Sequence, residues 1–158
     1  LVLEMGNEMV GTVGNVQFSP NLVNVVPNRV EMTIDLRSPV ESTLAEAEER
    51  FMATVQALCA AENVLLETER LVRLEPVRFD PDLVSLVETL AAKRGFSHRQ
   101  MVSGAGHDAQ MFAAIAPACM IFVPSIGGIS HNVQEATEDA DLIAGCQLLS
   151  DVVLRLAI

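Results

Sequence analysis

The stretch GGISHNVQEAT at residues 127–137 contains His131, one of only three histidines in a chain of 158 residues. It follows an apolar run and opens with two glycines, which let a backbone come close to a bound ligand. Neutral imidazole is the commonest metal ligand, and Glu135, four residues later, could orient a neighbouring group. A single histidine is more often structural or solvated, and catalytic zinc takes about three protein ligands. His131 is therefore a candidate ligand that cannot build a metal site alone.

His107 stands in an equivalent place, because the glycine-containing sequence SGAGHD (103–108) leads up to it. Ligands gather at the carboxyl ends of strands in open α/β sheets, so two histidines at such ends favour a functional interpretation. His107 with Asp108 could form a base and its orienting carboxylate, although adjacent residues rarely pair in this way. Ser103 does not lie in a GxSxG sequence, so a hydrolase nucleophile elbow is not predicted. His98, in a polar segment, is interpreted as structural or solvated.

Two side chains of the first half could hold a carboxylate. Arg37 ends an alternating segment on its polar face, and its planar guanidinium could bind a carboxylate through two hydrogen bonds. Asn24, in PNLVNVVPN (20–28), could donate its amide to the same group. The simpler alternatives stay open: a solvated edge charge for Arg37 and a turn former for Asn24.

Hydrophobic spacing predicts the strands, loop and helix that position Asn24 and Arg37. Residues 10–18 are predicted to form a strand and residues 19–28 a loop, since the latter are rich in proline and asparagine. Residues 29–37 alternate strictly between apolar and polar side chains, which predicts a half-buried strand. Residues 38–63 have helical spacing, and residues 64–76 are a predicted strand. This order indicates an α+β layer with one open sheet face.

The second half alternates strands with helices. A helix is predicted to begin after Asp80, with Pro81 at its first position and Gly95 beyond its end. The remaining predicted elements are a strand at 98–104, a helix at 107–116, a strand at 118–125 and a helix at 138–158. Such alternation is typical of a parallel or mixed α/β sheet. The boundary between the halves is expected at residues 75–80.

Composition excludes several classes of partner. The formal net charge is −11 and the sequence pI is about 4.5, which argues against nucleic acid and against an anionic membrane surface. The three cysteines are far apart and form no CxxC pair, as in proteins of a reducing compartment. No signal peptide or apolar run of membrane-spanning length is visible, so a cytoplasmic location is expected.

Three segments together resemble the metal-dependent amidohydrolases that include N-carbamoyl-L-amino-acid hydrolase, allantoate amidohydrolase and β-ureidopropionase. They are PNLVNVVPNRVEMTIDLRSP, SGAGHDAQMFA and MIFVPSIGGISHNVQEAT, in order and sensibly spaced. These enzymes belong with the zinc aminopeptidase and carboxypeptidase-like superfamily. The resemblance covers nearly the whole chain. It implies hydrolysis of the carbamoyl or ureido C–N bond of N-carbamoyl amino acids or related ureido acids.

The resemblance also implies a fold of the α/β class. Residues 1–76 correspond to the later part of an α+β lid, or dimerisation, domain, through which a homodimer is expected. Residues 77–158 correspond to the C-terminal part of an α/β zinc-peptidase-like catalytic domain. The complete active site would hold two divalent metal ions, which could be Zn, Mn, Co or Ni.

The resemblance assigns a role to each candidate residue. His131 matches the histidine of the family's GxSH motif, which is a metal ligand. His107 matches an active-site histidine next to the substrate, with a catalytic and a binding role. Asn24 and Arg37 match residues that bind the carboxylate of a small-molecule substrate. They lie on either side of a turn, so they could converge across a hairpin.

The family's other metal ligands come from an earlier segment. That segment carries a His-x-Asp motif, a Glu-Glu pair whose first member is the general base, and another histidine, and it has no counterpart in this sequence. The chain is therefore expected to be the C-terminal part of such an enzyme, inactive alone and without a stably bound metal. Two alternatives remain open: a non-catalytic dimerisation or binding module, and a peptidase of the same superfamily.

Overall fold

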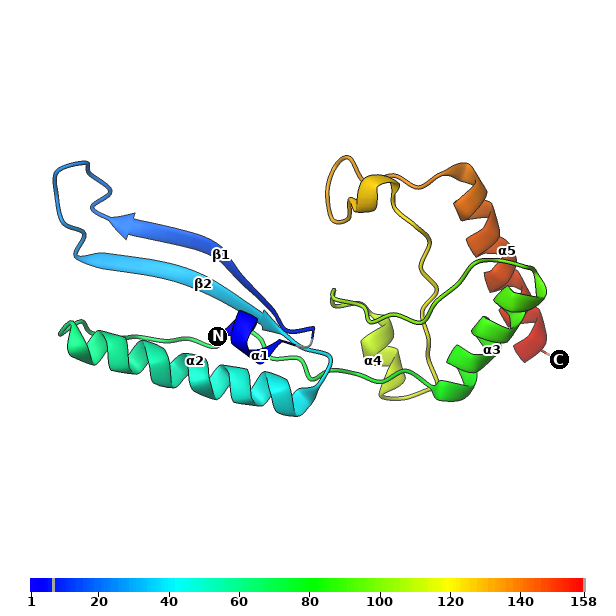
Figure 1. The fold of residues 1–158 in the computed structure, drawn as a ribbon, viewed down its shortest axis with the longest axis horizontal. Helices are drawn as coiled ribbons and strands as arrows, with labels where there is room; N and C mark the ends of the chain where they lie inside the picture. The colour runs from blue at the N-terminus through cyan, green and yellow to red at the C-terminus, as the bar shows by residue number, and fades with distance from the viewer. Residues whose placement is uncertain (7, 158) are drawn as a thin grey trace. The chain divides into compact units, whose positions relative to one another are not determined.

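The computed structural model describes residues 1–6 and 8–157, which fall into two compact units (Figure 1). We call residues 1–76 the N-terminal unit and residues 77–158 the C-terminal unit. The structure combines helices with one sheet, so the mixed helix-and-sheet class is confirmed. The interpretation of the units as lid and catalytic parts remains a prediction. No helix in the described ranges is long and apolar enough to cross a membrane.

The N-terminal unit is a β-hairpin with a long helix beside it. Its elements are α1 (Val2–Met5), β1 (Val10–Ser19), β2 (Arg29–Arg37) and α2 (Glu41–Ala61). The strands pair antiparallel, with Val10 opposite Arg37 and Ser19 opposite Arg29, and an irregularity between Val13 and Asn15. The two predicted strands and the predicted helix in this region are confirmed.

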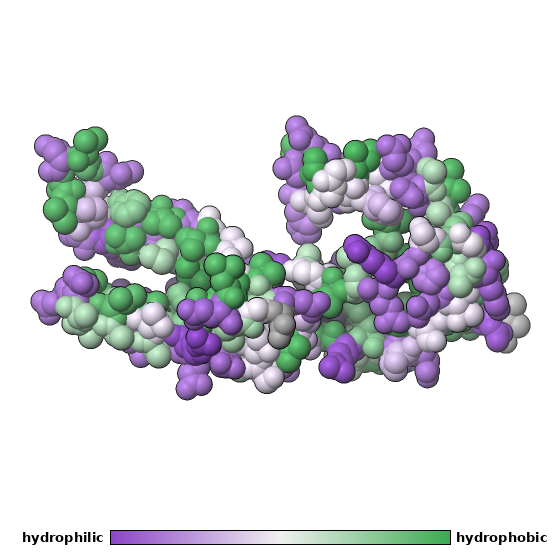
Figure 2. Space-filling model, in the orientation of Figure 1, coloured by the Kyte–Doolittle hydropathy of each residue, from purple (hydrophilic) through white to green (hydrophobic). Residues whose placement is uncertain are grey.

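The core of this unit lies at one end of the hairpin. Met9, Leu44 and Ala47 are buried there, and Leu36 packs against them. Further along the same strand, Val30 is 47% and Met32 is 53% exposed. Figure 1 shows the hairpin diverging from α2 toward its tip, and Figure 2 shows apolar side chains on the visible surface of the hairpin. The apolar face of the hairpin is thus covered only near its base.

Residues 64–76 do not form the predicted strand. Helix α2 stops in a Schellman turn at Asn63, whose φ is 52°, and Val64 N–H donates to Cys59 O at 2.8 Å. The chain then runs back along α2 (Figure 1), where Arg73 forms ion pairs with Glu48, at 3.0 Å, and with Glu41. A strand exists only through a ladder of backbone hydrogen bonds. Here the attachment is by side chains, so the strand prediction is wrong.

The C-terminal unit contains three α-helices and a short 3₁₀ turn in its described residues. These are α3 (Pro81–Lys93), α4 (Ala109–Ala113), η1 (Ile126–Gly128) and α5 (Asp139–Leu156). Helix α3 begins as predicted, because the Asp80 carboxylate accepts from Leu83 N–H at 2.9 Å. It also ends as predicted: Gly95 has a φ of 72°, and Phe96 N–H donates to Ala91 O at 3.0 Å.

Helices α3 and α5 pack on each other, with Ala91, Leu148 and Val152 buried. Arg94 joins them: its guanidinium donates to Asp151 Oδ1 at 2.7 Å and to Gln147 Oε1 at 3.3 Å. Gly145 of α5 faces the apolar run 118–125, where an added Cβ would come within 2.5 Å of Val123 Cγ1. Close packing at this point therefore requires glycine.

Three elements predicted for this unit differ in the structure. The helix expected at 107–116 shortens to Ala109–Ala113, and the described residues at 98–104 and 118–125 have no strand ladder. The parallel or mixed sheet predicted for this half is therefore not formed. An apolar, β-branched run becomes a strand only where a neighbouring strand completes its hydrogen bonds. In the run 118–125, Ala118 O accepts from Asp80 N–H at 3.0 Å and Ser125 O accepts from Gly128 N–H at 3.0 Å, and neither bond belongs to a strand ladder.

Candidate functional site

His131 lies in a tightly turned loop that follows the apolar run 118–125. The chain passes through η1, where Gly127 and Gly128 have φ values of 65° and 71°, and His131 itself has a φ of 55°. Glycine adopts positive φ without strain, but a residue with a Cβ does so at a cost. His131 is exposed. The glycines thus turn the chain so that the imidazole reaches the surface on a left-handed backbone.

Glu135 contacts His131 through the backbone. Its Oε2 accepts from the His131 N–H at 2.7 Å, a short distance typical of a carboxylate acceptor. Its own N–H donates to Asn132 O at 3.0 Å, and Gln134 N–H donates to Asn132 Oδ1 at 2.9 Å. Glu135 thus contacts the main chain of His131 and not its ring, and its predicted role in orienting a neighbouring group stays a prediction.

His107 lies immediately before α4 with its ring turned back onto the helix start. Ala109 N–H donates to His107 Nδ1 at 3.1 Å, and His107 N–H donates to Gln110 Oε1 at 3.2 Å. An Nδ1 that accepts a hydrogen bond carries no proton, so in the neutral ring the proton is on Nε2. The Nε2–H therefore points away from the helix start as a donor. No hydrogen bond between the His107 ring and the Asp108 carboxylate occurs in the described structure, so the pairing of these neighbours is not formed.

Arg37 is held by Asp35, which lies two residues earlier on the same face of β2. The Arg37 Nε donates to both Asp35 oxygens at 3.0 Å, and Nη2 donates to Oδ2 at 2.5 Å. Both side chains are about half exposed. The hydrogen bonds from Arg37 hold the pKa of the Asp35 carboxyl below its usual value, and they raise the pKa of Arg37. Sequence reasoning missed Asp35, although the spacing of two along a strand is a signal that could have found it.

Asn24 does not approach Arg37 within one chain. It lies in a turn of the loop that Asn28 closes by donating its N–H to Ser19 O at 2.8 Å. Arg37 pairs with Val10 at the other end of the hairpin. Since β2 rises about 3.3 Å per residue, roughly 26 Å of strand separates the two ends. The expectation that the two side chains converge across the hairpin is therefore wrong.

The described residues bring together no group of three or more His, Cys, Asp or Glu side chains that could hold a metal ion. His131 fits one ligand position by its chemistry, because its imidazole is exposed and its backbone is fixed by Glu135. Asn24 and Arg37 belong to the N-terminal unit, whereas His107 and His131 belong to the C-terminal unit.

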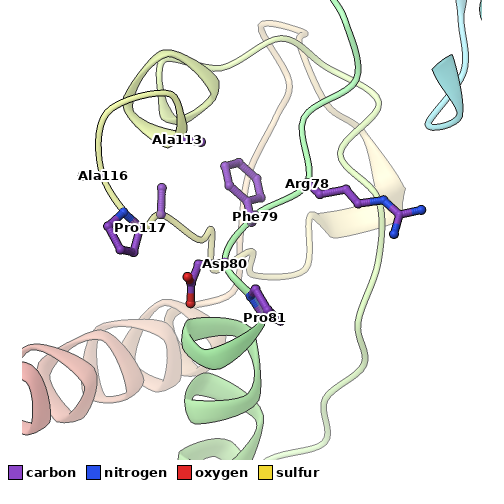
Figure 3. Close-up of a pocket in the computed structure, with 8 residues that line it drawn as sticks. Arg78, Phe79, Asp80, Pro81, Ala113, Ala116 and Pro117 are labelled. Atoms are coloured by element: carbon purple, nitrogen blue, oxygen red, sulfur yellow. The ribbon is translucent and has the colours of Figure 1, made fainter.

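A shallow cavity of about 370 Å³ in the C-terminal unit contains none of the predicted site residues. It lies between the start of α3 and the segment after α4 (Figure 3). The Phe79 ring points toward Ala113, whereas the Arg78 side chain extends away. Asp80, its one carboxylate, already caps α3. The only carboxylate among the described lining residues is therefore already used to cap a helix, and it is not free to bind a ligand.

The sequence matches the model of peptidase family M20/M25/M40 over residues 3–155. It is 38% identical to an allantoate amidohydrolase of Bacillus subtilis over 154 residues, which cover 98% of this chain and 37% of that protein. It is 42% identical to an N-carbamoyl-L-amino-acid amidohydrolase of Rhizobium meliloti, covering 94% of this chain and 36% of that protein. The chain thus spans a little over a third of the length of these relatives.

Solved structures give the same result. A hydantoinase/carbamoylase family amidase from Burkholderia multivorans superposes with a TM-score of 0.91 at 37% identity, over 98% of this chain and 38% of that one. A second from Burkholderia vietnamiensis gives a TM-score of 0.89 at 38% identity, with 98% and 37% covered.

Proposed function

The chain belongs to peptidase family M20/M25/M40, and from this premise we propose that it is part of a longer amidohydrolase. That enzyme would cleave the carbamoyl or ureido C–N bond of an N-carbamoyl amino acid or a related ureido acid. Relatives named as enzymes of this kind are 38–42% identical to the chain. The observation that carries the proposal is the exposed His131 imidazole, held on a fixed loop in a chain with these relatives.

In this proposal His131 is one ligand of a metal site, and the other ligands lie outside these residues. When bound, a divalent metal such as Zn, Mn, Co or Ni supplies Lewis acidity and an activated water. The imidazole must then be neutral and correctly aimed. The loop that fixes the His131 backbone serves the second requirement.

His107 is proposed to act on the substrate. Because its Nδ1 is occupied by Ala109 N–H, the neutral ring presents an Nε2–H donor. Such a donor can stabilise negative charge on the oxygen of the carbonyl that is attacked. Gln110 holds the backbone of His107 in place. The ring would therefore be ready to donate before the substrate arrives.

Arg37 and Asn24 are proposed to bind the substrate: Arg37 holds its carboxylate, and Asn24 holds either another group or the same carboxylate from a second copy of the chain. A guanidinium already oriented by Asp35 loses less side-chain freedom when an anion binds. A homodimer through the N-terminal unit is also proposed. Both strands of the hairpin have an outer edge with no neighbouring strand in the described structure, and such edges can pair with another chain.

The test compares a full-length protein that contains this chain with residues 1–158 alone. Metal content would be measured, together with ammonia release from N-carbamoyl amino acids and allantoate and release of free amino acids from a dipeptide. We expect ammonia release and bound metal only for the full-length protein. Faster cleavage of the dipeptide would favour a peptidase, and the absence of any hydrolysis in the full-length protein would favour a binding module.

A further inference from the structure

His131 has a left-handed backbone, which is uncommon for a residue other than glycine. Three residues other than glycine have positive φ in the described ranges: Glu8, Asn63 and His131. Asn63 ends helix α2 in a Schellman turn, where asparagine is common. Residue 131 does not end a helix, and although histidine is found at positive φ more often than most residues, the conformation still has a cost that an interaction can offset.

The Glu135 carboxylate supplies that interaction. Its Oε2 accepts from the His131 N–H at 2.7 Å, while its own N–H is bound to Asn132 O at 3.0 Å. Glu135 thus closes the turn 131–135 through two hydrogen bonds, one from its side chain and one from its main chain. The His131 ring forms no hydrogen bond with other described residues, so the hydrogen bond from its N–H to Glu135 is the side-chain contact that holds His131 in this turn.

We propose that Glu135 is a positioning residue that aims the His131 imidazole by locking its main chain. Relative to the preceding peptide, the φ of a residue sets the direction of its Cα–Cβ bond, and χ1 and χ2 then set the direction of the ring from that bond. A shift of His131 to an ordinary negative φ would swing the ring away from its present direction. This inference rests on the proposed role of His131 as a metal ligand. It adds Glu135 as the residue that orients this ligand.

The inference distinguishes two ways in which a carboxylate can support a ligand histidine. The commoner one is a hydrogen bond to the ring nitrogen that does not bind metal. In that case the carboxylate fixes the tautomer, and the backbone N–H of the histidine is not involved. Here the backbone N–H is the donor, so the nuclear magnetic resonance signal of that amide reports the contact directly.

The experiment uses the full-length protein with Glu135→Ala and Glu135→Gln, and with Gln134→Ala as a matched control in the same turn. The readouts are the affinity for added Zn²⁺, measured against a chelator, and the ¹H–¹⁵N signal of the His131 amide after selective ¹⁵N-histidine labelling. A melting curve of each variant shows whether it is folded. His131→Ala assigns the amide signal and tests the ligand role separately.

For Glu135→Ala we expect Zn²⁺ affinity to fall about 10–100-fold, together with an upfield shift of the His131 amide proton. Glu135→Gln keeps an oxygen acceptor, so both readouts should recover in part, and Gln134→Ala should leave both unchanged. Loss of affinity with an unmoved amide signal would overturn the inference, and so would a moved signal with normal affinity. If His131→Ala keeps full affinity, the ligand role of His131 is wrong, whatever the amide signal shows.

Discussion

Asn24 and Arg37 lie at opposite ends of the β1–β2 hairpin, with Arg37 opposite Val10 and Asn24 in the loop beyond Ser19. The sequence resemblance nevertheless implies that both residues bind the carboxylate of one substrate. One hairpin cannot bring both side chains to the same carboxylate. Either they hold different groups, or the site uses Asn24 of one copy and Arg37 of another.

Arg37→Lys in a full-length protein should weaken the use of substrates that carry a carboxylate. Lysine keeps the charge but not the planar fork, so a loss of about 1.5–3 kcal/mol in kcat/KM is expected. Kinetics on an N-carbamoyl amino acid and on its amide analogue would measure this. An equal loss on both substrates would mean that Arg37, with Asp35, only stabilises the strand.

The double variant Asn24→Ala with Arg37→Lys tests whether the two groups share a partner. Effects of residues more than about 10 Å apart add to within about 0.5 kcal/mol. The hairpin geometry predicts such additivity in log(kcat/KM). A coupling energy above about 1 kcal/mol would show that both side chains bind one carboxylate, which requires two copies of the chain.

His131 and His107 should differ in what their loss removes. His131→Ala should lower both metal occupancy and turnover, because a ligand is lost. His107→Ala should lower turnover by about 10²–10³-fold, as for the loss of one donor to a developing oxyanion, while the metal stays. Metal analysis of the two purified variants beside their rates decides this. The reverse pattern would mean that the two assignments are exchanged.

Gly145→Ala should destabilise the protein although alanine favours helices. Its Cβ would meet Val123 Cγ1 at 2.5 Å, and overpacking costs about 1–3 kcal/mol, against a propensity gain of about 1 kcal/mol. Thermal unfolding would show a lower Tm. Adding Val123→Ala should restore part of it, and Ser150→Ala, exposed on the same helix, should change little. A higher Tm for Gly145→Ala would mean that the segment 118–125 moves aside.

The pair between Arg94 and Asp151 should make stability depend on pH in the acid range. Hydrogen bonds from Arg94 lower the pKa of Asp151 in the folded protein, whereas in the unfolded chain it stays at its usual value of about 3.9. Between these two values the unfolded state binds more protons. The stabilisation is therefore complete above the unfolded pKa and is lost as pH falls through the folded one.

Asp151→Asn should accordingly lower Tm at pH 7, and the difference should shrink as pH falls below about 3.9 towards the lowered pKa of Asp151 in the folded protein. Melting curves of the two proteins across this range measure the difference. Glu69→Gln, an exposed carboxylate in the extended segment after α2, is the control. A Tm difference that stays constant from pH 7 to pH 2 would mean that the pair contributes by packing rather than by charge.

Local signals in the sequence predicted the three longer helices, but they overestimated the length of α4. Asp80 and Gly95 each act on the backbone within a few residues, so α3 could be predicted with both its caps. The strict alternation of residues 29–37 likewise predicted β2. In α3 and β2, the sequence signal therefore lies within the element itself or within a few residues of it.

Features that depend on distant partners could not be predicted in the same way. Residues 64–76 and 118–125 have strand-like composition, but only a neighbouring strand would make them strands. The separation of Asn24 from Arg37 depends on the register of the hairpin, which places Arg37 beside Val10. The contact of Glu135 with the His131 N–H occurs where His131 has a positive φ, and that φ could not be predicted from the sequence.

Amide protons of the hairpin should exchange with solvent at rates that change steadily along its length. Near Arg37 the strands lie on the buried cluster of Met9, Leu44 and Ala47, so opening there disrupts the core. Toward the tip the apolar face is half exposed, and opening disrupts little besides the ladder itself. The segment with Asn24 therefore lies at the weakly protected end. It can rearrange around a ligand while the base of the hairpin stays folded.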